Sequence, residues 1–375
     1  MARSAGLDLV RSAAISLVLL SHCGDTFAIW LGGRAPAWLS VSGFFGVELF
    51  FVLSGFLIGR LLIRIVADQP GLPAWWVFML RRWMRTLPAY LVWLAFLAAF
   101  WPPRFWEPGH WTLTWRYVLR YATLTQNLAW PMRDGWFGVS WSLTVEEWFY
   151  LSFSAALFGA VVWLGSRAGF WAACAIFLAV PLALRWGVPD SVDFGEVLTK
   201  VAVLRLDAIA FGVVVAWMEA RRGVLFRHPL AALAVGLLLI AIVWSGWLDR
   251  IVPLDVHVHR TILFDIASIG FALCLPGAAA LQRLPRLPAA VVLAISTQSY
   301  AIYLIHLSIL EFAGYYRESW QVPASITMAA SLALIWALSW ASWRWIEAPI
   351  LARRPHQRSE APSPAAVAAN QSSAS

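Results

Sequence analysis

Charged residues are scarce in this chain: Asp, Glu, Lys and Arg make up 13% of its 375 residues, against 61% hydrophobic residues. The mean hydropathy is +0.70. A soluble globule of this size needs more polar surface than such a composition supplies, which excludes an ordinary water-soluble fold. The sequence therefore predicts a protein that uses lipid as part of its solvent.

Cysteine is also rare, and Cys23, Cys174 and Cys274 all lie in or beside apolar segments. They form neither a disulfide framework nor a metal-binding spacing, so we expect no metal site. The chain contains no GxSxG elbow and no phosphate-binding loop, which argues against a serine hydrolase or an ATPase. Its net charge of +8 comes from basic residues at the ends of apolar segments, so nucleic acid is not an expected partner.

Apolar segments long enough to cross a bilayer recur along the sequence. A hydrocarbon core about 30 Å thick requires ~20 residues of helix, and the segments lack the period-two alternation of barrel strands. We therefore predict an all-α fold, a polytopic integral membrane helix bundle of about ten transmembrane helices. The predicted spans are 7–29, 44–66, 86–101, 141–163, 169–186, 201–218, 229–247, 262–281, 289–312 and 323–343.

Positive charge is distributed unevenly between alternate loops, which predicts that both termini are cytoplasmic. We expect residues 1–352 to form one transmembrane domain and residues 353–375, rich in Ala, Ser and Pro, to form a disordered cytoplasmic tail. The long outer loop, 102–140, also holds arginines and is compatible with a half-buried or re-entrant segment around 112–130. The arginines on the predicted inner side are Arg60, Arg64, Arg81, Arg82, Arg85, Arg167, Arg221, Arg222, Arg227, Arg283, Arg286, Arg353, Arg354 and Arg358.

The first span carries ionisable residues, which are unfavourable inside a bilayer and so require a reason. Arg11 and His22 are eleven residues apart, which is three helical turns plus about 20°, so both face one groove about 16 Å apart. Asp25, one turn beyond His22, is placed to orient the imidazole or to raise its basicity. A lone buried histidine is more often structural, but sharing a face with Arg11 favours a functional role.

Further polar residues lie in or beside the following spans. In the second span, Glu48 is an acid near the outer end, and Ser54 with Gly55 permits close backbone approach, although Gly55 could equally serve helix packing. Three guanidiniums, Arg81, Arg82 and Arg85, lie at the cytoplasmic end of the third span. They suit a phosphate-bearing donor such as coenzyme A, and anchoring to lipid headgroups is an equal alternative.

Two adjacent carboxylates, Glu146 and Glu147, enter the fourth span, and at ~100° per residue at most one can point fully into a cavity. His306 in the ninth span and Asp207 in the sixth complete the intramembrane polar residues. Arg205 and Glu347 are interpreted as members of structural pairs.

These strings together resemble the acyltransferase-3 family of membrane acyltransferases. The resemblance extends from Leu7 to about Pro349, with Glu48 where many relatives have Asp. It rests on Arg11 and His22 with ten residues between them; Phe50-Phe51 with Ser54-Gly55-Phe56; Arg81, Arg82 and Arg85 with Pro88; Trp141-Ser142-Leu143 with Glu146, Glu147, Phe149 and Tyr150; and Ser299-Tyr300 with Tyr303 and His306.

The resemblance implies an O-acyltransferase of the bacterial inner (plasma) membrane. It would move an acyl group, commonly acetyl, from cytoplasmic acyl-coenzyme A to a hydroxyl of a saccharide or other glycosylated acceptor. Acyl-coenzyme A is then a co-substrate and no bound cofactor is expected. The candidate catalytic residues are His22, Arg11, Glu48, Glu146 and Glu147; the candidate donor-binding residues are Arg81, Arg82, Arg85 and Ser54; and Asp25, Tyr150, Tyr300 and His306 are further candidates.

In this mechanism His22 takes the proton of the acceptor hydroxyl, and Arg11 binds a donor phosphate or stabilises charge on the thioester oxygen. An acyl-histidine intermediate is an open alternative. The main rival function is a transporter or flippase of a lipid-linked or glycosylated solute, because it also needs a polar groove through a helix bundle. A purely structural membrane protein fits less well, since the intramembrane His, Arg and Glu would lack a purpose.

Overall fold

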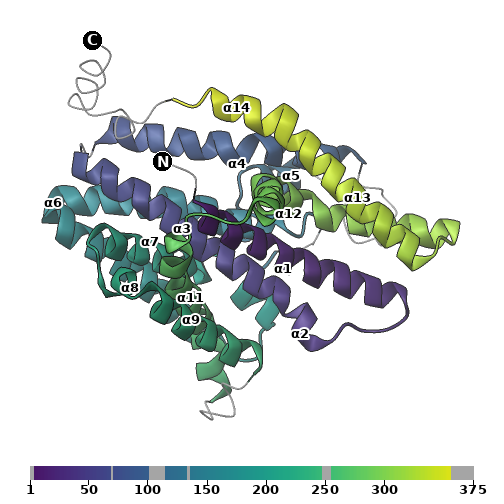
Figure 1. Ribbon diagram of the computed structural model, residues 1–375, viewed down its shortest axis with the longest axis horizontal. Coiled ribbons are helices and arrows are strands. Elements are labelled where there is room, and N and C mark those ends of the chain that lie inside the picture. The colour runs from purple at the N-terminus through teal and green to yellow at the C-terminus, as the bar shows by residue number, and fades with distance from the viewer. Residues whose placement is uncertain (1–3, 69–70, 101–114, 133–135, 247–254, 356–375) are drawn as a thin grey trace.

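The computed structural model describes residues 4–68, 71–100, 115–132, 136–246 and 255–355. Every regular element within these ranges is a helix, which confirms the all-α prediction (Figure 1). The longer helices are α1 (Ala5–Trp30), α3 (Ser42–Asp68), α4 (Leu72–Phe100), α6 (Ser140–Trp186), α7 (Leu206–Ala220), α9 (Pro229–Trp244), α11 (Val256–Ala280), α12 (Arg286–Trp320) and α13 (Ala324–Ser342). Short elements are α2 (Ala37–Ser40), α5 (Trp115–Ala122), η2 (Phe194–Thr199), η3 (Ala202–Leu204), α8 (Val224–Arg227), η4 (Trp343–Glu347) and α14 (Ala348–Ala352).

Seven helical segments among the described residues are long and apolar enough to cross a membrane. The protein is therefore an integral membrane protein with a polytopic helix bundle. Each of the ten predicted spans overlaps one of the observed helices, but α7 and α9 have only 15 and 16 residues. At 1.5 Å per residue they are about 22–24 Å long, less than the ~30 Å hydrocarbon core, so the count of ten stays a prediction.

Helix α6 is a hairpin, because Gly165 reverses the chain direction at φ +77° and ψ 167°, a conformation that glycine adopts without strain. A Cβ atom on Gly169 would lie 2.6 Å from the carbonyl carbon of Ala160. The rings of Phe153 and Phe177 are 5.2 Å apart, whereas a straight helix would separate these residues by about 36 Å. The two arms therefore correspond to the predicted spans 141–163 and 169–186.

Helices α3 and α7 approach each other through small residues at the centre of the bundle. A Cβ atom on Gly55 would lie 1.9 Å from the carbonyl oxygen of Ile209, and one on Gly212 would lie 2.0 Å from that of Val52. Neither position has room for a side chain, so the two backbones are in direct contact, as in other membrane helix pairs. Of the two uses considered for Gly55, the structure shows helix packing.

The described part of the long outer loop packs against the bundle. The Asn127 side chain, 0% exposed, donates to the carbonyl oxygens of Trp141 (3.0 Å) and Lys200 (2.6 Å). The backbone N–H of Ala202 donates to the carbonyl of Asn127 at 2.9 Å. This segment is half-buried, as the sequence allowed, whereas residues 101–114 and 133–135 lie outside the described residues.

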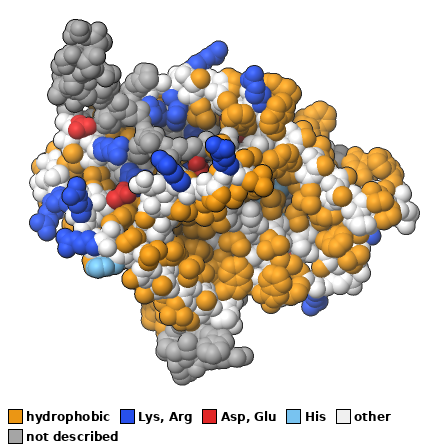
Figure 2. Space-filling view, in the orientation of Figure 1, with side chains coloured by type: hydrophobic (Ala, Val, Ile, Leu, Met, Phe, Trp, Pro, Cys, Tyr) orange, Lys and Arg blue, Asp and Glu red, His pale blue; other side chains and the backbone are white. Residues whose placement is uncertain are grey.

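The surface of the bundle is mainly apolar on the face shown in Figure 2. Most Lys and Arg side chains visible there gather toward the side of the bundle where α14 ends in Figure 1. This one-sided clustering agrees with the arginine asymmetry of the sequence. Residues 356–375, most of the predicted tail, lie outside the described residues.

Candidate active site

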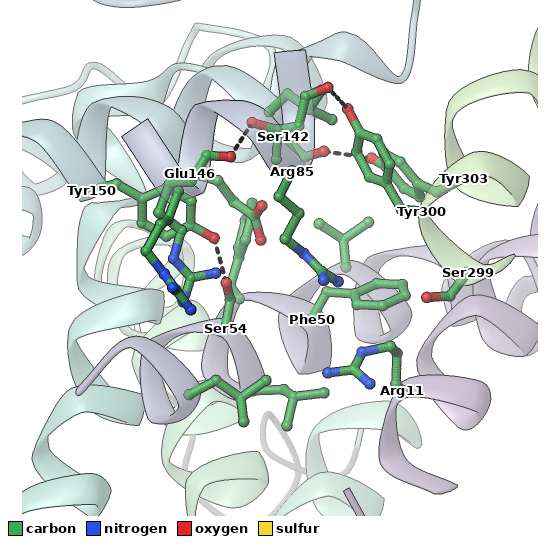
Figure 3. Close-up of a pocket in the computed structure, with 18 of the residues that line it drawn as sticks. Arg11, Phe50, Ser54, Arg85, Ser142, Glu146, Tyr150, Ser299, Tyr300 and Tyr303 are labelled. Carbon is green, nitrogen blue, oxygen red and sulfur yellow. Dashed lines mark hydrogen bonds between the residues drawn. The ribbon is translucent and has the colours of Figure 1, made fainter. Parts of the chain in front are cut away.

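A cavity of about 440 Å³ lies between α1, α3, α4, α6 and α12 (Figure 3). Its wall combines basic and apolar side chains. The basic residues are Arg11, Arg81, Arg82, Arg85 and Arg354, and Glu146 is the one carboxylate in the described wall. The apolar part is formed largely by α3 residues, namely Val47, Phe50, Phe51, Leu53, Leu57 and Leu61.

Helix α4 supplies three of these arginines because Arg82 and Arg85, and likewise Arg81 and Arg85, are about one helical turn apart. Arg82 lies over the ring of Tyr150 at 5.3 Å. Among the described residues, neither Arg82 nor Arg85 has a salt-bridge partner within 4 Å. The cavity therefore holds guanidinium charge that internal ion pairs do not neutralise, a setting suited to an anionic ligand.

Arg354 belongs to the cavity wall although the sequence analysis assigned it to the tail. It follows α14, and beside it the carbonyl oxygen of Pro355 accepts a hydrogen bond from Arg81 at 2.5 Å. No local pattern predicts this position, since Arg354 lies beyond the last apolar span. Thr86 is a second wall residue that the sequence analysis did not single out.

The adjacent carboxylates of α6 have different environments. Glu146 lines the cavity, close to Ser54 and Tyr150, whose hydroxyl groups are hydrogen-bonded to each other (Figure 3). Glu147 is buried outside the cavity wall and accepts a hydrogen bond from the Thr86 hydroxyl at 2.6 Å. The structure thus brings Glu146, Ser54 and Tyr150 together with the arginines and separates Glu147 from them.

Helix α12 closes the cavity with Ser299, Tyr300 and Tyr303. The Tyr300 hydroxyl donates to the carbonyl oxygen of Thr86 at 2.7 Å, and the hydroxyls of Tyr303 and Ser142 are 2.7 Å apart. Both tyrosines are therefore fixed by bonds to α4 or α6, as Figure 3 shows for Tyr303.

Arg11 reaches the cavity from α1, but part of its guanidinium is engaged by α12. Its Nη1 atom donates to the Asp8 carboxylate at 3.0 Å and to the Ser296 hydroxyl at 3.1 Å. The Ser296 hydroxyl in turn donates to Asp8 at 2.7 Å. This triangle holds Arg11 at the edge of the cavity and neutralises part of its charge.

His22 lies outside the cavity wall and is paired with His306 of α12. Nδ1 of His22 is 2.7 Å from Nε2 of His306, and the rings stack with centroids 5.0 Å apart. The Asp25 carboxylate instead accepts a hydrogen bond from Ser40 at 2.6 Å. The expectation that Asp25 orients the imidazole is therefore corrected: the ring partner of His22 is His306.

One aromatic side chain, Tyr303, lies next to both the cavity and the histidine pair. Tyr303 lines the cavity, and its ring centroid is 5.9 Å from that of His306. The Phe50 ring, also in the wall, is 6.2 Å from Tyr303. Tyr303 thus lies next to both the predicted donor-binding cavity and the ring that partners the predicted base.

Glu48 does not reach the cavity, contrary to its assignment as a candidate catalytic residue. It is 0% exposed; one carboxylate oxygen accepts from Arg205 and the other from the Ser268 hydroxyl. With both oxygens occupied inside the packing of α3, α7 and α11, Glu48 is part of a structural ion pair. The interpretation of Arg205 as a structural partner agrees with this contact.

A second buried ion-pair cluster, centred on Arg185, was not predicted from the sequence. Arg185, 0% exposed, lies 2.6 Å from Asp207 and 2.5 Å from Asp265, and it donates to the carbonyl oxygen of Thr261 at 3.0 Å. The sequence prediction includes Asp207 among the intramembrane polar residues but gives it no partner, and it assigns no role to Arg185. Such partners are far apart in the sequence, so only the fold identifies them.

Three known proteins illustrate what the sequence is similar to. The chain is 25% identical over 381 residues to a protein of Staphylococcus aureus (strain COL) named as a candidate O-acetyltransferase, covering 92% of this chain and 56% of that protein. A candidate membrane-bound transacylase of Komagataeibacter xylinus is 36% identical over 97 residues, 26% of this chain and 20% of that protein. The regulator of hypoxia-inducible factor 1 of Caenorhabditis elegans is 28% identical over 171 residues, 39% of this chain and 32% of that protein.

The chain spans little more than half the length of the Staphylococcus relative, 56%. No solved structure matches the chain. The model of the acyltransferase-3 family, described as an acyltransferase domain, matches residues 4–344. Because this match covers nearly the whole sequence, the protein belongs to the acyltransferase-3 family.

Proposed function

We propose that this protein is a membrane O-acyltransferase whose arginine-lined cavity binds the phosphates of an acyl-coenzyme A donor. The observation that carries the proposal is the group of arginines around the cavity, with Glu146 as the one carboxylate in its described wall. Guanidinium groups bind phosphate oxygens in a forked, bidentate geometry, and coenzyme A carries several phosphate groups. A neutral solute would give no reason for this charge.

The apolar part of the cavity supports the orientation of the donor. With its phosphates at Arg82 and Arg85, the donor can extend its pantetheine arm along the α3 wall formed by Phe50, Leu53 and Leu57. The thioester then lies toward Tyr303, a wall residue whose ring is 5.9 Å from that of His306. Acetyl is the acyl group we favour, in line with the O-acetyltransferase name of the Staphylococcus relative.

His22 is the proposed general base. The acceptor hydroxyl oxygen forms a bond to the acyl carbon while His22 takes the hydroxyl proton. The carbon–sulfur bond of the thioester breaks, and the proton passes to the leaving sulfur, so free coenzyme A and the O-acyl product result. Arg11, at the edge of the cavity, stabilises negative charge on the thioester oxygen or binds a donor phosphate.

The proposed acceptor is a saccharide or another glycosylated molecule. We further propose that the enzyme lies in a bacterial plasma membrane with both termini cytoplasmic. In that orientation the arginine end of the bundle meets cytoplasmic donor, and the outer half of α1, which carries His22, meets the acceptor.

Acyl transfer by the purified protein tests this proposal. Wild-type protein in lipid nanodiscs receives acetyl-coenzyme A labelled in its acetyl group, together with oligosaccharides of bacterial surface polymers. We expect label on an oligosaccharide and an equal amount of free coenzyme A, and a loss of about 10²–10⁴-fold in His22→Ala. Transport of the oligosaccharides into sealed vesicles without acyl transfer would contradict the proposal.

A further inference from the structure

His306 has a defined proton position. Its Nδ1 atom is 2.8 Å from the carbonyl oxygen of Tyr303 and 3.1 Å from that of Ile302. A carbonyl oxygen only accepts hydrogen bonds, so Nδ1 of His306 must carry the hydrogen. In the neutral ring the other nitrogen, Nε2, then holds a lone pair and can only accept.

This arrangement determines the tautomer of His22. The Nε2 atom of His306 is 2.7 Å from Nδ1 of His22, so Nδ1 of His22 must be the donor. The neutral His22 ring therefore has its lone pair on Nε2. The Nε2 atom of His22 has no hydrogen-bond partner among the described residues. It is also absent from the buried side-chain atoms of these residues that lack a partner, so Nε2 is accessible from outside the packed interior.

The surrounding contacts hold this geometry in place. Helices α1 and α12 run parallel here, tied by the Arg11–Ser296 hydrogen bond three turns below the histidine pair. The hydroxyl of Ser12 donates to the carbonyl of Val292 at 2.9 Å. His306 is 0% exposed and its ring is stacked on that of His22, so it cannot rotate without disturbing the α12 packing.

We propose that His306 is a positioning residue that fixes the Nδ1–H tautomer of His22 and thereby directs the basic Nε2 atom to the acceptor hydroxyl. This inference rests on the proposed function, in which His22 is the base. When Nε2 takes the hydroxyl proton, the imidazolium keeps its Nδ1–H bond to His306. His306 neither gains nor loses a proton, and the proton on Nε2 goes to the leaving sulfur.

A neutral histidine suits this task inside a bilayer. In many hydrolases a carboxylate holds the catalytic imidazole in its tautomer. A second buried carboxylate would be costly in the membrane interior, whereas a histidine anchored on backbone carbonyls supplies the same acceptor without a charge. The nearest acid on α1, Asp25, accepts a hydrogen bond from Ser40, and His306 is the partner of the His22 ring.

Nitrogen NMR of histidine tests the tautomer directly and without activity. Protein labelled with ¹⁵N-histidine is compared with the His22→Gln variant to assign the His22 signals, at a pH where the ring is neutral. We expect a protonated Nδ1 and an unprotonated Nε2 in the wild type, and a mixture of both tautomers in His306→Leu. A wild-type His22 protonated on Nε2 would overturn the inference, even if acyl transfer by the wild type upheld the proposed function.

Kinetics of variants at position 306 provide the second arm. His306→Leu should lower kcat by about 10–100-fold, as loss of an orienting partner does, with the KM for acetyl-coenzyme A unchanged. His306→Gln should recover much of the rate, because its amide oxygen can accept from Nδ1–H while its NH₂ donates to the α12 carbonyls. The matched control is His228→Leu, since His228 is exposed between α8 and α9.

The two arms separate the possible failures. Equal rates for His306→Leu and the wild type, or no recovery in His306→Gln beyond His306→Leu, would overturn the positioning role. Full activity of His22→Gln would instead refute His22 as the base, and the positioning role would fall with the proposed function. The NMR result on the wild type stands even if His306→Leu does not fold.

Discussion

Glu146 and Glu147 are neighbours in the sequence, yet only Glu146 faces the arginine-lined cavity, while Glu147 is bonded to Thr86 at 2.6 Å. Successive residues of a helix diverge by about 100°, so the α6 backbone alone divides the pair. The two carboxylates should therefore differ in their effect on the affinity for a bound anion, and a matched pair of variants can measure this difference.

Glu146→Gln should tighten binding of coenzyme A by about fivefold, because removing one partly screened negative charge is worth ~1 kcal/mol. Glu147→Gln should leave the affinity unchanged, since its carboxylate lies outside the cavity wall. Titration calorimetry on protein in nanodiscs measures both dissociation constants. Equal effects of the two substitutions would show that the charge in the cavity does not determine the affinity for coenzyme A.

The α3–α7 contact should be intolerant of any side chain at Gly55. A Cβ atom there would lie 1.9 Å from a backbone oxygen of α7, so Gly55→Ala must push the helices apart, and we expect Tm to fall by about 5 °C or more. The control is Gly159→Ala, because a Cβ atom on Gly159 meets nothing within 4 Å. Thermal unfolding in detergent provides the comparison, and similar Tm values for both variants would refute the close contact.

The Glu48–Arg205 pair should stabilise the fold only as a pair. Arg205→Met leaves the Glu48 carboxylate buried without its charged partner, a change that typically costs about 3–5 kcal/mol. The double variant Glu48→Gln/Arg205→Met removes both charges and should be more stable than Arg205→Met alone. Chemical unfolding of both variants measures this, and a catalytic rather than structural Glu48 would leave the single variant as stable as the wild type.

The number of spans depends on whether the short helix α9 crosses the membrane. Reporter fusions after Gly223, before α8 and α9, should score cytoplasmic, and fusions after Gly246, beyond α9, should score outside. A bilayer that thins locally, or a helix with flanking residues at the interface, accommodates such a 16-residue helix. The same side for both fusions would reduce the predicted count of ten.

Local sequence patterns were sufficient for the parts of the structure that depend on local chemistry. Hydropathy located the helices, including the two arms of α6, although the reversal at Gly165 has no apolar signature. One-turn spacing brought Arg81, Arg82 and Arg85 to the cavity, and the 100° rule explained why Glu146 and Glu147 diverge. These features follow from the period of a single helix.

Contacts between distant helices could not be predicted in the same way. Helical spacing placed Asp25 near His22, but the actual partner, His306, is 284 residues away on α12. The family resemblance suggests a catalytic role for Glu48, but in the structure its carboxylate pairs with Arg205, 157 residues away. Arg354 reached the cavity wall only through the packing of α14 beside α4.

Binding of coenzyme A to Arg85→Ala, with Arg64→Ala as the control, tests the central claim most directly. Arg85 lines the cavity, whereas Arg64 is an exposed arginine of α3 outside its wall. The account predicts that Arg85→Ala weakens binding at least tenfold, the equivalent of ~1.4 kcal/mol for a charged hydrogen bond, with partial recovery in Arg85→Lys and weaker binding at high salt. Unchanged affinity in Arg85→Ala, or an equal loss in Arg64→Ala, would contradict it.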